Sequence, residues 1–251
     1  MGQPALALSR AAPAEDFEMR FVDRDGVERR DLLRACWMET FEVAPPVRKF
    51  NSYLGQRSFD GLWWSATTSD HVGYESWLER DHVMLLDFDP DVTGLASQPF
   101  QIGWQQGGRL RWHTPDYFVR MVDGTGVVVD VRPDDRIDPE DAEAFEATAR
   151  ACDSVGWRFR RVGEIDAVFA ANLRWLAGYR HPRCLHQGRA ADLLRVFSRP
   201  AGLMEGARRV GDPIAVLPTL FHLLWRQALS TDLAVSALSA ASVVQAGGEE
   251  Q

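Results

Sequence analysis

The sequence contains almost no lysine, only three cysteines and no long apolar run. Lys49 is the single lysine among 28 basic residues, so arginine supplies nearly all of the positive charge. Because no stretch of about 18 apolar residues occurs, we expect no membrane-spanning helix. Residues 1–13 lack the charged region and apolar core of a secretory signal. Three cysteines cannot form a disulfide framework and suit a reducing compartment, so we expect a cytoplasmic protein.

The overall charge limits how the chain can bind nucleic acid. Its 36 acidic and 28 basic residues give a formal net charge of −8, which argues against non-specific coating of DNA. Any DNA contact must therefore come from local basic patches. Two arginine-rich stretches supply the candidate DNA-binding residues, which are Arg48, Lys49, Arg57, Arg158 and Arg160. The second stretch is explained most simply as a half-buried edge strand with a basic outer face, and only secondarily as a phosphate track.

A buried strand is predicted to end in two charged residues. Residues 126–132 are β-branched until Asp130 and Arg132. Side chains alternate along a strand, so these two project together while Val129 and Val131 point the other way. Charges at the end of a core strand are costly unless they are paired, exposed or bound to a ligand. This segment is therefore the first place to look for function.

A second carboxylate is expected beside this strand end. Residues 114–122 are strand-like, and a short turn containing Gly124 joins them to the next strand, which predicts an antiparallel hairpin. Asp116 begins one strand and Asp130 ends the other, so pairing can bring them level at one edge of the sheet. Two aspartates are hard oxygen ligands that suit Mg²⁺ or Mn²⁺. The alternative is a hairpin whose acidic ends are only solvated.

Residues 73–88 are predicted to form a helix. Trp77, Leu78, Val83 and Leu85-Leu86 are expected on its buried side. Glu75 and Glu79 are four residues apart, so they would share one face. That face is either a solvated acidic surface or the source of a glutamate that completes a metal site with the two aspartates.

Five short motifs follow one another between residues 75 and 132. They are Glu75-Ser76-x-Leu78-Glu79-Arg80, Leu86-Asp87-Phe88-Asp89-Pro90-x-Val92, Gln98-Pro99, Thr114-Pro115-Asp116 and Asp130-x-Arg132. In this order they resemble the TnsA-like transposase endonuclease subunits of the PD-(D/E)xK nuclease superfamily. The resemblance covers about residues 70–180, and more loosely the whole chain.

The resemblance implies roles for individual residues. The family's helix glutamate falls on Glu79, with Glu75 as the fallback. Its metal-binding aspartate falls on Asp116 and its second acidic or amide ligand on Asp130. These two, with the Val131 carbonyl, would hold one or two Mg²⁺ or Mn²⁺ ions.

Arg132 departs from the family pattern, which has lysine there. Arginine stays protonated and presents a planar fork. It can hold a phosphate or stabilise a developing oxyanion, but it cannot accept a proton. Asp130 is also shorter than a glutamate, so a weakened or inactive site stays open as an alternative.

The first two parts of the chain are a leader and an α/β region. Residues 1–70 form the leader, with a hairpin turn at Asp25-Gly26, and are expected to pack on the core. Residues 71–180 carry the predicted α/β pattern, for which the resemblance implies a PD-(D/E)xK, restriction-endonuclease-like core. After the first helix, its expected elements are strands 98–104 and 109–113, the hairpin, helix 138–152, strand 157–162 and helix 166–177.

Residues 187–246 are expected to form a separate unit. Three helical patterns, at residues 190–197, 202–210 and 214–229, precede short strands at 229–235 and 239–244. This order describes a small winged-helix-like domain, which the resemblance also implies. The alternative is a helical cap. The third helix carries only Arg226 as a base, so protein contact or support is favoured over reading of a DNA sequence.

The sequence and the resemblance together predict a Mg²⁺-dependent DNA endonuclease, that is, a phosphodiester hydrolase. It would nick one strand at transposon ends with metal-activated water. The implied partners are transposon-end DNA, an integrase-type recombinase subunit and an ATPase regulator. Two alternatives stay open: a catalytically silent scaffold of nuclease fold that binds DNA or a partner, and a stand-alone repair or restriction nuclease.

Overall fold

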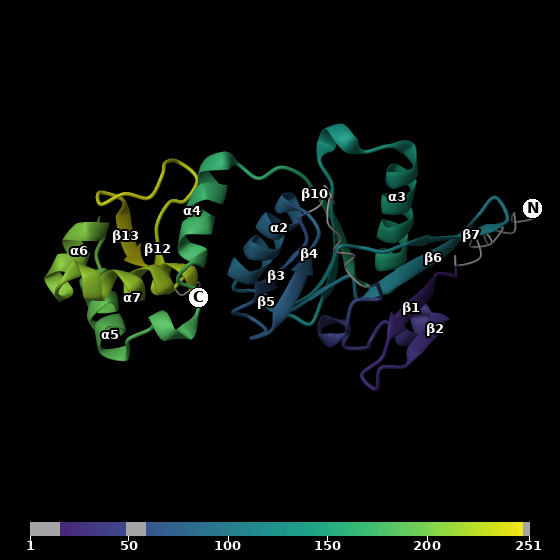
Figure 1. Ribbon diagram of the computed structural model, residues 1–251, viewed down its shortest axis with the longest axis horizontal. Helices are drawn as coiled ribbons and strands as arrows, with labels where there is room; N and C mark the ends of the chain where they lie inside the picture. The colour runs from purple at the N-terminus through teal and green to yellow at the C-terminus, as the bar shows by residue number, and fades with distance from the viewer. Residues whose placement is uncertain (1–15, 49–58, 248–251) are drawn as a thin grey trace, which may run out of the picture.

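The computed structural model describes residues 16–48 and 59–247, which form a mixed α/β structure with two lobes (Figure 1). The larger lobe contains strands β1 to β10 with helices α2 and α3, and the smaller lobe contains helices α5 to α7. Helix α4 (Ala167–Ala177) lies between them and is capped by Asp166, as predicted. None of the helices in the two described ranges is long and apolar enough to cross a membrane.

The first sheet of the larger lobe joins the leader to the central region. Its strand order is β2-β1-β6-β7, and every neighbouring pair is antiparallel. The strands are Glu18–Val22 (β1), Glu28–Leu32 (β2), Phe100–Gln106 (β6) and Arg109–His113 (β7). The predicted leader hairpin is confirmed, and Gly26 in its turn has a φ of 77°, which glycine adopts without strain.

The second sheet contains the predicted hairpin. Its strand order is β10-β9-β8-β5, formed by Val92–Ser97 (β5), Tyr117–Met121 (β8), Gly126–Val131 (β9) and Arg158–Val162 (β10). The pairing of β8 with β9 is antiparallel and aligns Tyr117 with Val129, which confirms the hairpin. β10 is the edge strand that its alternating apolar and basic residues predicted, and it runs parallel to β9.

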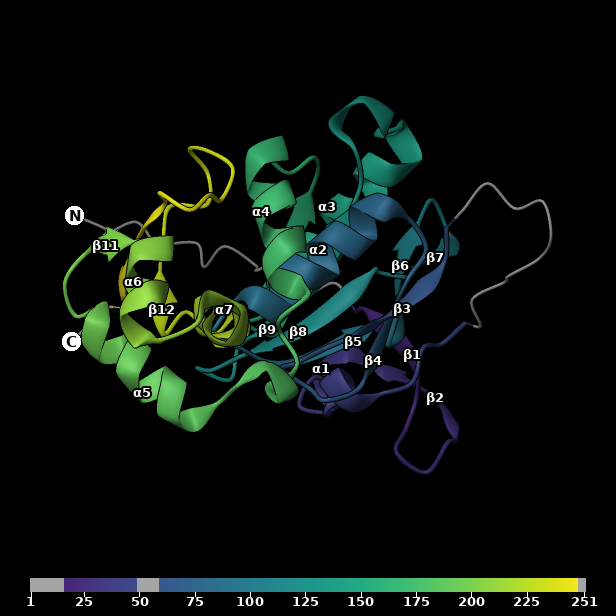
Figure 2. The same ribbon diagram turned by 60° about the vertical axis from the view of Figure 1, so that its left-hand side comes forward.

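Helices cover both faces of this second sheet, because successive apolar side chains of its strands point to opposite faces. Val127 and Val129 belong to the same core cluster as Val83 of α2 (Trp77–Phe88). Val128 belongs to a different cluster, which includes Ala147 of α3 (Pro139–Ser154). Helix α3 is predicted correctly, and the Asp138 carboxylate caps it by accepting from the N–H groups of Glu140 and Asp141. Figure 2 shows α2 lying beside α4.

The predicted start of the first helix is wrong. Residues 71–74 belong to a strand, β4 (His71–Tyr74), and α2 begins at Trp77 with Ser76 as its N-cap. Trp77 was expected to be buried, but it is 49% exposed. Its indole ring lies outside the core, 5.2 Å from the ring of Phe59 and 4.3 Å from the Arg80 guanidinium. The first turn of a helix that starts at the surface has no core to face.

Two other predicted boundaries shift where a non-glycine residue has a positive φ. Gln98 was expected to begin a strand, but its φ is 47° and β6 begins at Phe100. The last helix, α7 (Pro213–Trp225), ends before Gln227, whose φ is 56°. Strand β5 was not predicted, and neither was the pairing of β4 with β3 (Gly61–Trp64). This pairing crosses residue 70, so the chain on both sides of that position folds together.

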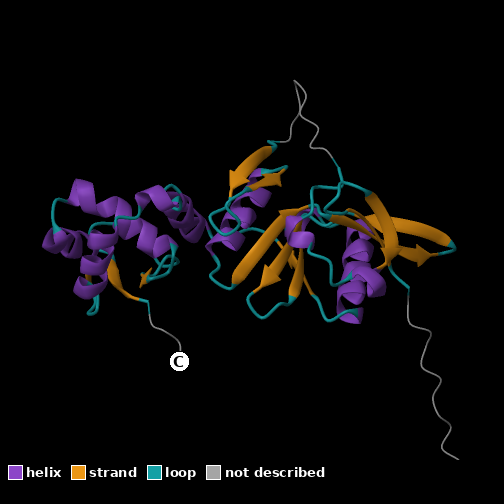
Figure 3. Cartoon of the chain, turned by 90° about the horizontal axis from the view of Figure 1, so that it is seen from below, coloured by secondary structure: helices purple, strands orange, loops and turns teal. Residues whose placement is uncertain are grey.

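Among the described residues, the smaller lobe contains helices α5 to α7 and a three-stranded sheet. Figure 3 shows this lobe beside the larger one, with helices in purple and strands in orange. The helices are Gln187–Val196 (α5), Leu203–Val210 (α6) and α7, close to the three predicted positions. The strand order is β11-β13-β12, formed by Ala201–Gly202, Val243–Ala246 and Leu229–Ser230. The remaining short elements are α1 (Leu33–Cys36), η1 (Phe41–Val43), η2 (Asp134–Arg136) and η3 (Pro182–Cys184).

Candidate active site

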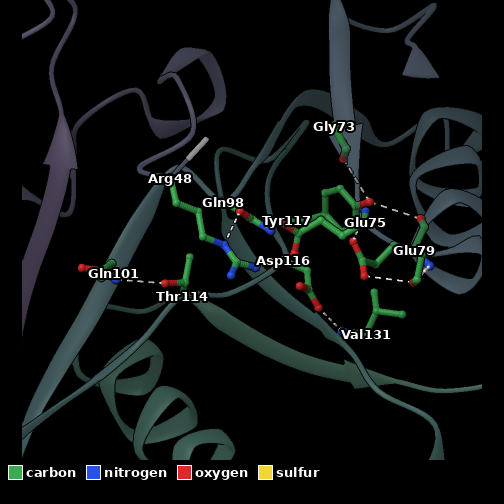
Figure 4. Close-up of polar contacts among 11 residues, drawn as sticks. Arg48, Gly73, Glu75, Glu79, Gln98, Gln101, Thr114, Asp116, Tyr117 and Val131 are labelled. Carbon is green, nitrogen blue, oxygen red and sulfur yellow. Dashed lines mark hydrogen bonds and ion pairs between the residues drawn. The ribbon is translucent and has the colours of Figure 1, made fainter. Parts of the chain in front are cut away.

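Asp116 lies directly before β8, on the side of the second sheet where β8 begins and β9 ends. We call this side of the sheet the acidic edge, after Asp116, Asp130 and Glu79. Its carboxylate Oδ2 accepts a hydrogen bond from the Val131 N–H at 2.7 Å, which ties the start of β8 to the end of β9 (Figure 4). Its carbonyl accepts from the Gln98 N–H at 2.9 Å. The antiparallel pairing predicted from sequence therefore holds Asp116 beside the end of β9.

Asp130 is the second acidic residue at this edge. It lies in β9 and is 3% exposed. Its Oδ2 lies 2.8 Å from the Nε2 atom of His113, which ends β7 in the other sheet. The two sheets thus meet at this pair of side chains.

Glu79 lies in the first turn of α2, where its carboxylate closes the helix end. Oε2 accepts from the Glu75 N–H at 2.7 Å, and Oε1 accepts from the Ser76 hydroxyl at 2.9 Å. The Ser76 hydroxyl in turn accepts from the Glu79 N–H at 3.1 Å, which completes a capping box displaced by one residue. The Tyr117 hydroxyl lies 3.2 Å from the Glu79 carbonyl and 3.3 Å from the Gly73 carbonyl, so β8 is connected to this end of α2.

Glu75 is not where the sequence placed it. It precedes α2, so it does not share a helix face with Glu79, and the prediction of an i,i+4 pair is wrong. Its Oε2 accepts from Arg48 at 2.5 Å. The capping of α2 by Ser76, rather than helical spacing, brings the two glutamates together.

Two of the acidic side chains here, Asp116 and Glu79, have a raised pKa. Burial raises the pKa of Asp116 well above its usual range, and the nearby charges of Asp130 and Glu79 raise it further. The Val131 N–H and the charge of Arg132 act in the opposite direction. Burial also raises the pKa of Glu79, against the lowering effect of its hydrogen bonds to Glu75 and Ser76. The carboxylates of Asp130 and Glu79 therefore both lie within electrostatic range of Asp116, an arrangement that a cation would stabilise.

The described residues do not form a closed metal centre. Within residues 16–48 and 59–247, no three His, Cys, Asp or Glu side chains lie close enough together to ligate one ion as they stand. The donor chemistry nevertheless suits a hard cation. Asp116 and Asp130 each use Oδ2 in the hydrogen bonds above, and among the described residues no hydrogen bond is made by either Oδ1.

Arg132 follows the end of β9 and pairs with a carboxylate of α3. Its guanidinium donates to Asp141 of α3 at 2.9 Å, and its side chain is 45% exposed. Its positive charge still reaches Asp116, whose pKa it lowers. Arg132 is thus near the acidic edge but is engaged by the start of α3.

Arg48 is the predicted DNA-binding residue that the structure places at this edge. Its Nε donates to the Gln98 side-chain carbonyl at 2.8 Å, and its Nη2 donates to the Glu75 carboxylate (Figure 4). Arg158 lies further along the sheet, opposite Val127, and pairs with Asp123 at 3.4 Å. The exposed Arg160 lies between that position and the acidic edge. The other two candidates, Lys49 and Arg57, lie outside the described residues.

Two residues of this region were assigned no role from sequence. His113 contacts Asp130, and Gln98 contacts both Arg48 and the backbone of Asp116. Gln98 is 1% exposed and has a positive φ, a combination that marks a position held by its surroundings. The nearest sequence signal was their place beside the motifs: His113 directly precedes Thr114-Pro115-Asp116, and Gln98 begins Gln98-Pro99.

Part of the chain, including Asp116 and Asp130, matches a known protein family. Residues 89–164 match the family model described as TnsA-like endonuclease N terminal. This part of the chain is similar to the N-terminal domain of TnsA-like endonucleases. The match runs from just before β5 to just after β10, so it contains Asp116, Asp130 and Arg132. The glutamates at the start of α2 and the whole smaller lobe lie outside it, and no curated protein matches the chain.

Proposed function

We propose that this chain is the metal-dependent DNA endonuclease subunit of a heteromeric transposase and nicks one strand at transposon ends. The observation that carries the proposal is the meeting of Asp116 and Asp130 at one sheet edge within a TnsA-like endonuclease domain. An integrase-type recombinase subunit would process the other strand, and an ATPase regulator would control assembly.

The carboxylates would hold the metal. Asp116, Asp130 and the Val131 carbonyl provide hard oxygen donors for one or two Mg²⁺ or Mn²⁺ ions. Such an ion would activate water and neutralise charge on the leaving oxygen of the phosphodiester. Glu79 would orient a ligand or a water beside Asp116, and the capping box would keep its carboxylate in position.

The arginines would position the DNA. Arg48 is held by Gln98 and Glu75, so its guanidinium can contact a phosphate next to the acidic edge. Arg132 would stabilise charge that develops on the scissile phosphate, after exchanging its contact with Asp141 for the substrate. Lys49, Arg57, Arg158 and Arg160 would contribute backbone contacts further along the DNA.

The smaller lobe would serve assembly. Its three helices and three-stranded sheet are compatible with a winged-helix-like domain. α7 ends at Trp225, and eight of its residues are buried, so little of it could read base edges. We therefore assign this lobe to protein contact or structural support.

The test is strand-specific cleavage of transposon-end DNA by the complete assembly of nuclease, recombinase and ATPase subunits with Mn²⁺. Asp116→Ala should abolish nicking by this subunit, because it removes one of the two proposed carboxylate ligands. Asp123→Ala is the matched control, since Asp123 lies in the turn at the other end of the same hairpin. Nicking retained by Asp116→Ala would refute the mechanism.

A catalytically silent scaffold is the second candidate, and two observations favour it. Arg132 is paired with Asp141, and no three His, Cys, Asp or Glu side chains of the described residues are close enough together to ligate one ion as they stand. A scaffold would support assembly on DNA while the wild-type chain leaves the strand uncut. The same cleavage assay, with assembly followed by gel shift, separates the two functions.

A further inference from the structure

His113 links the two sheets of the larger lobe through one polar contact. It is the last residue of β7 and pairs with Ile102 of β6, so its backbone belongs to the first sheet. Asp130 lies in β9 of the second sheet, and the atoms His113 Nε2 and Asp130 Oδ2 are 2.8 Å apart. A side chain of the first sheet, His113, therefore holds a side chain of the second sheet, Asp130.

Asp130 depends on this contact for its orientation. Its side chain is 4% exposed and that of His113 is 19% exposed, so the pair is largely shielded from water. Within the described part of the chain, His113 is the hydrogen-bonding partner of the Asp130 carboxylate. Arg161 is opposite Asp130 in β10, but its guanidinium bonds to Asp134 instead. A buried carboxylate without a donor would be costly, so His113 determines where this group sits.

The imidazole is itself held in place. Its ring meets the ring of Phe145 in α3 edge to face, with the ring centres 6.1 Å apart. The backbone of β7 fixes it from one side and α3 from the other. An imidazole with restricted rotation can hold only one carboxylate oxygen, which leaves Oδ1 of Asp130 for another ligand.

We propose that His113 is a positioning residue that holds Asp130 as a metal ligand beside Asp116. The inference rests on the proposed function, because it takes Asp130 to be a ligand. Hydrogen-bond partners of metal ligands fix the direction of the donor atoms, and losing one weakens metal binding by about 10–100-fold. His113 touches neither substrate nor metal in this role.

The test measures Mn²⁺ binding to the full chain by water-proton relaxation. His113→Ala should weaken binding about 10–100-fold. His113→Gln should recover most of it, because the glutamine amide can reach the position of Nε2. His71→Ala is the matched control, since His71 is an exposed histidine that begins β4, and it should bind as the wild type does.

Asp130→Ala separates failure of the inference from failure of the proposed function. If Asp130→Ala loses Mn²⁺ and His113→Ala binds as the wild type, His113 only joins the sheets and the inference is overturned. If Asp130→Ala also binds as the wild type, Asp130 is no ligand and the proposed metal site falls with the inference. Should His113→Ala fail to fold, His113→Gln and His113→Asn are compared instead. Glutamine places its amide near the position of Nε2, which contacts Asp130, whereas asparagine places its amide near Nδ1, so His113→Asn should bind Mn²⁺ more weakly. Equal affinities of these two variants would overturn the inference.

Discussion

Asp116 is held where its ionised form is disfavoured. Burial raises its pKa, and the charges of Asp130 and Glu79 act in the same direction. The hydrogen bond from the Val131 N–H compensates only in part. A residue in this situation destabilises the fold at neutral pH in the absence of a cation, which is common at functional sites.

Asp116→Asn should stabilise the metal-free chain at pH values above the ordinary aspartate pKa of about 3.9. The folded pKa is raised, so the unfolded state loses its proton first as the pH rises, and wild-type stability falls until the raised pKa is passed. Each pKa unit of the shift corresponds to about 1.4 kcal/mol. Asparagine stays neutral and can still accept from Val131.

Urea unfolding at a series of pH values checks this prediction. The stability difference between Asp116→Asn and the wild type should be small near pH 4 and larger near pH 8. Asp123→Asn is a control of opposite sign, because hydrogen bonds from Thr125 lower the pKa of Asp123. A difference that does not change with pH would contradict the assignment.

At the same scale, the sequence predicted some residues of the site and missed others. Asp116 and Asp130 could be paired because a hairpin with a short turn fixes which strand ends are level. His113 could not be assigned, because its contact with Asp130 joins two different sheets. No local sequence pattern predicts how two sheets pack against each other.

At the scale of elements, the capping box of α2 joins helix stability to the acidic edge. Ser76→Ala removes the acceptor for the Glu79 N–H and one contact of the Glu79 carboxylate. We expect a loss of about 1 kcal/mol in the free energy of unfolding. Ser76→Thr keeps the hydroxyl and should lose much less.

Chemical unfolding with urea, followed by circular dichroism, measures both changes. Equal stabilities of Ser76→Ala and the wild type would show that the cap makes no net contribution. A rearranged Glu79 without its cap should also alter the ionisation of its neighbours at the acidic edge, which the pH series described for Asp116 can detect.

The wrong start of this helix has a physical explanation. Residues 73–88 carry an apolar pattern that a helix could use throughout. His71–Tyr74 instead pairs with Gly61–Trp64, and this pairing with a distant segment overrides local preference. The cap at Ser76 was visible in the sequence as Ser-x-x-Glu, so the start at Trp77 could have been predicted from it.

At the scale of the whole molecule, one apolar cluster extends through both lobes. Leu173 and Leu176 of α4 belong to the same cluster as Val83 of α2 and Leu220 of α7. Arg174 of α4 also pairs with Asp81 of α2. The two lobes therefore share part of their core, and we expect them to unfold together.

Leu176→Ala should destabilise the chain by about 2–5 kcal/mol, because it opens a cavity at a fully buried position. Leu194→Ala in α5 is the matched control, because Leu194 is 38% exposed and should cost much less. Hydrogen exchange is the measurement, with amides of β9 and α7 as reporters of the two lobes. Faster exchange in α7 alone would show that the lobes unfold independently.

The sequence by itself determined many of the local elements and the pairing of the two strands at which Asp116 and Asp130 lie, because alternation, turn residues and caps act over a few residues. It also indicated the endonuclease family, which the match over residues 89–164 confirms for that segment. Only the tertiary structure decided that His113 holds Asp130, that Arg48 lies at the acidic edge and that Arg132 turns to Asp141. These contacts join segments from different layers, and their geometry depends on packing of the whole fold.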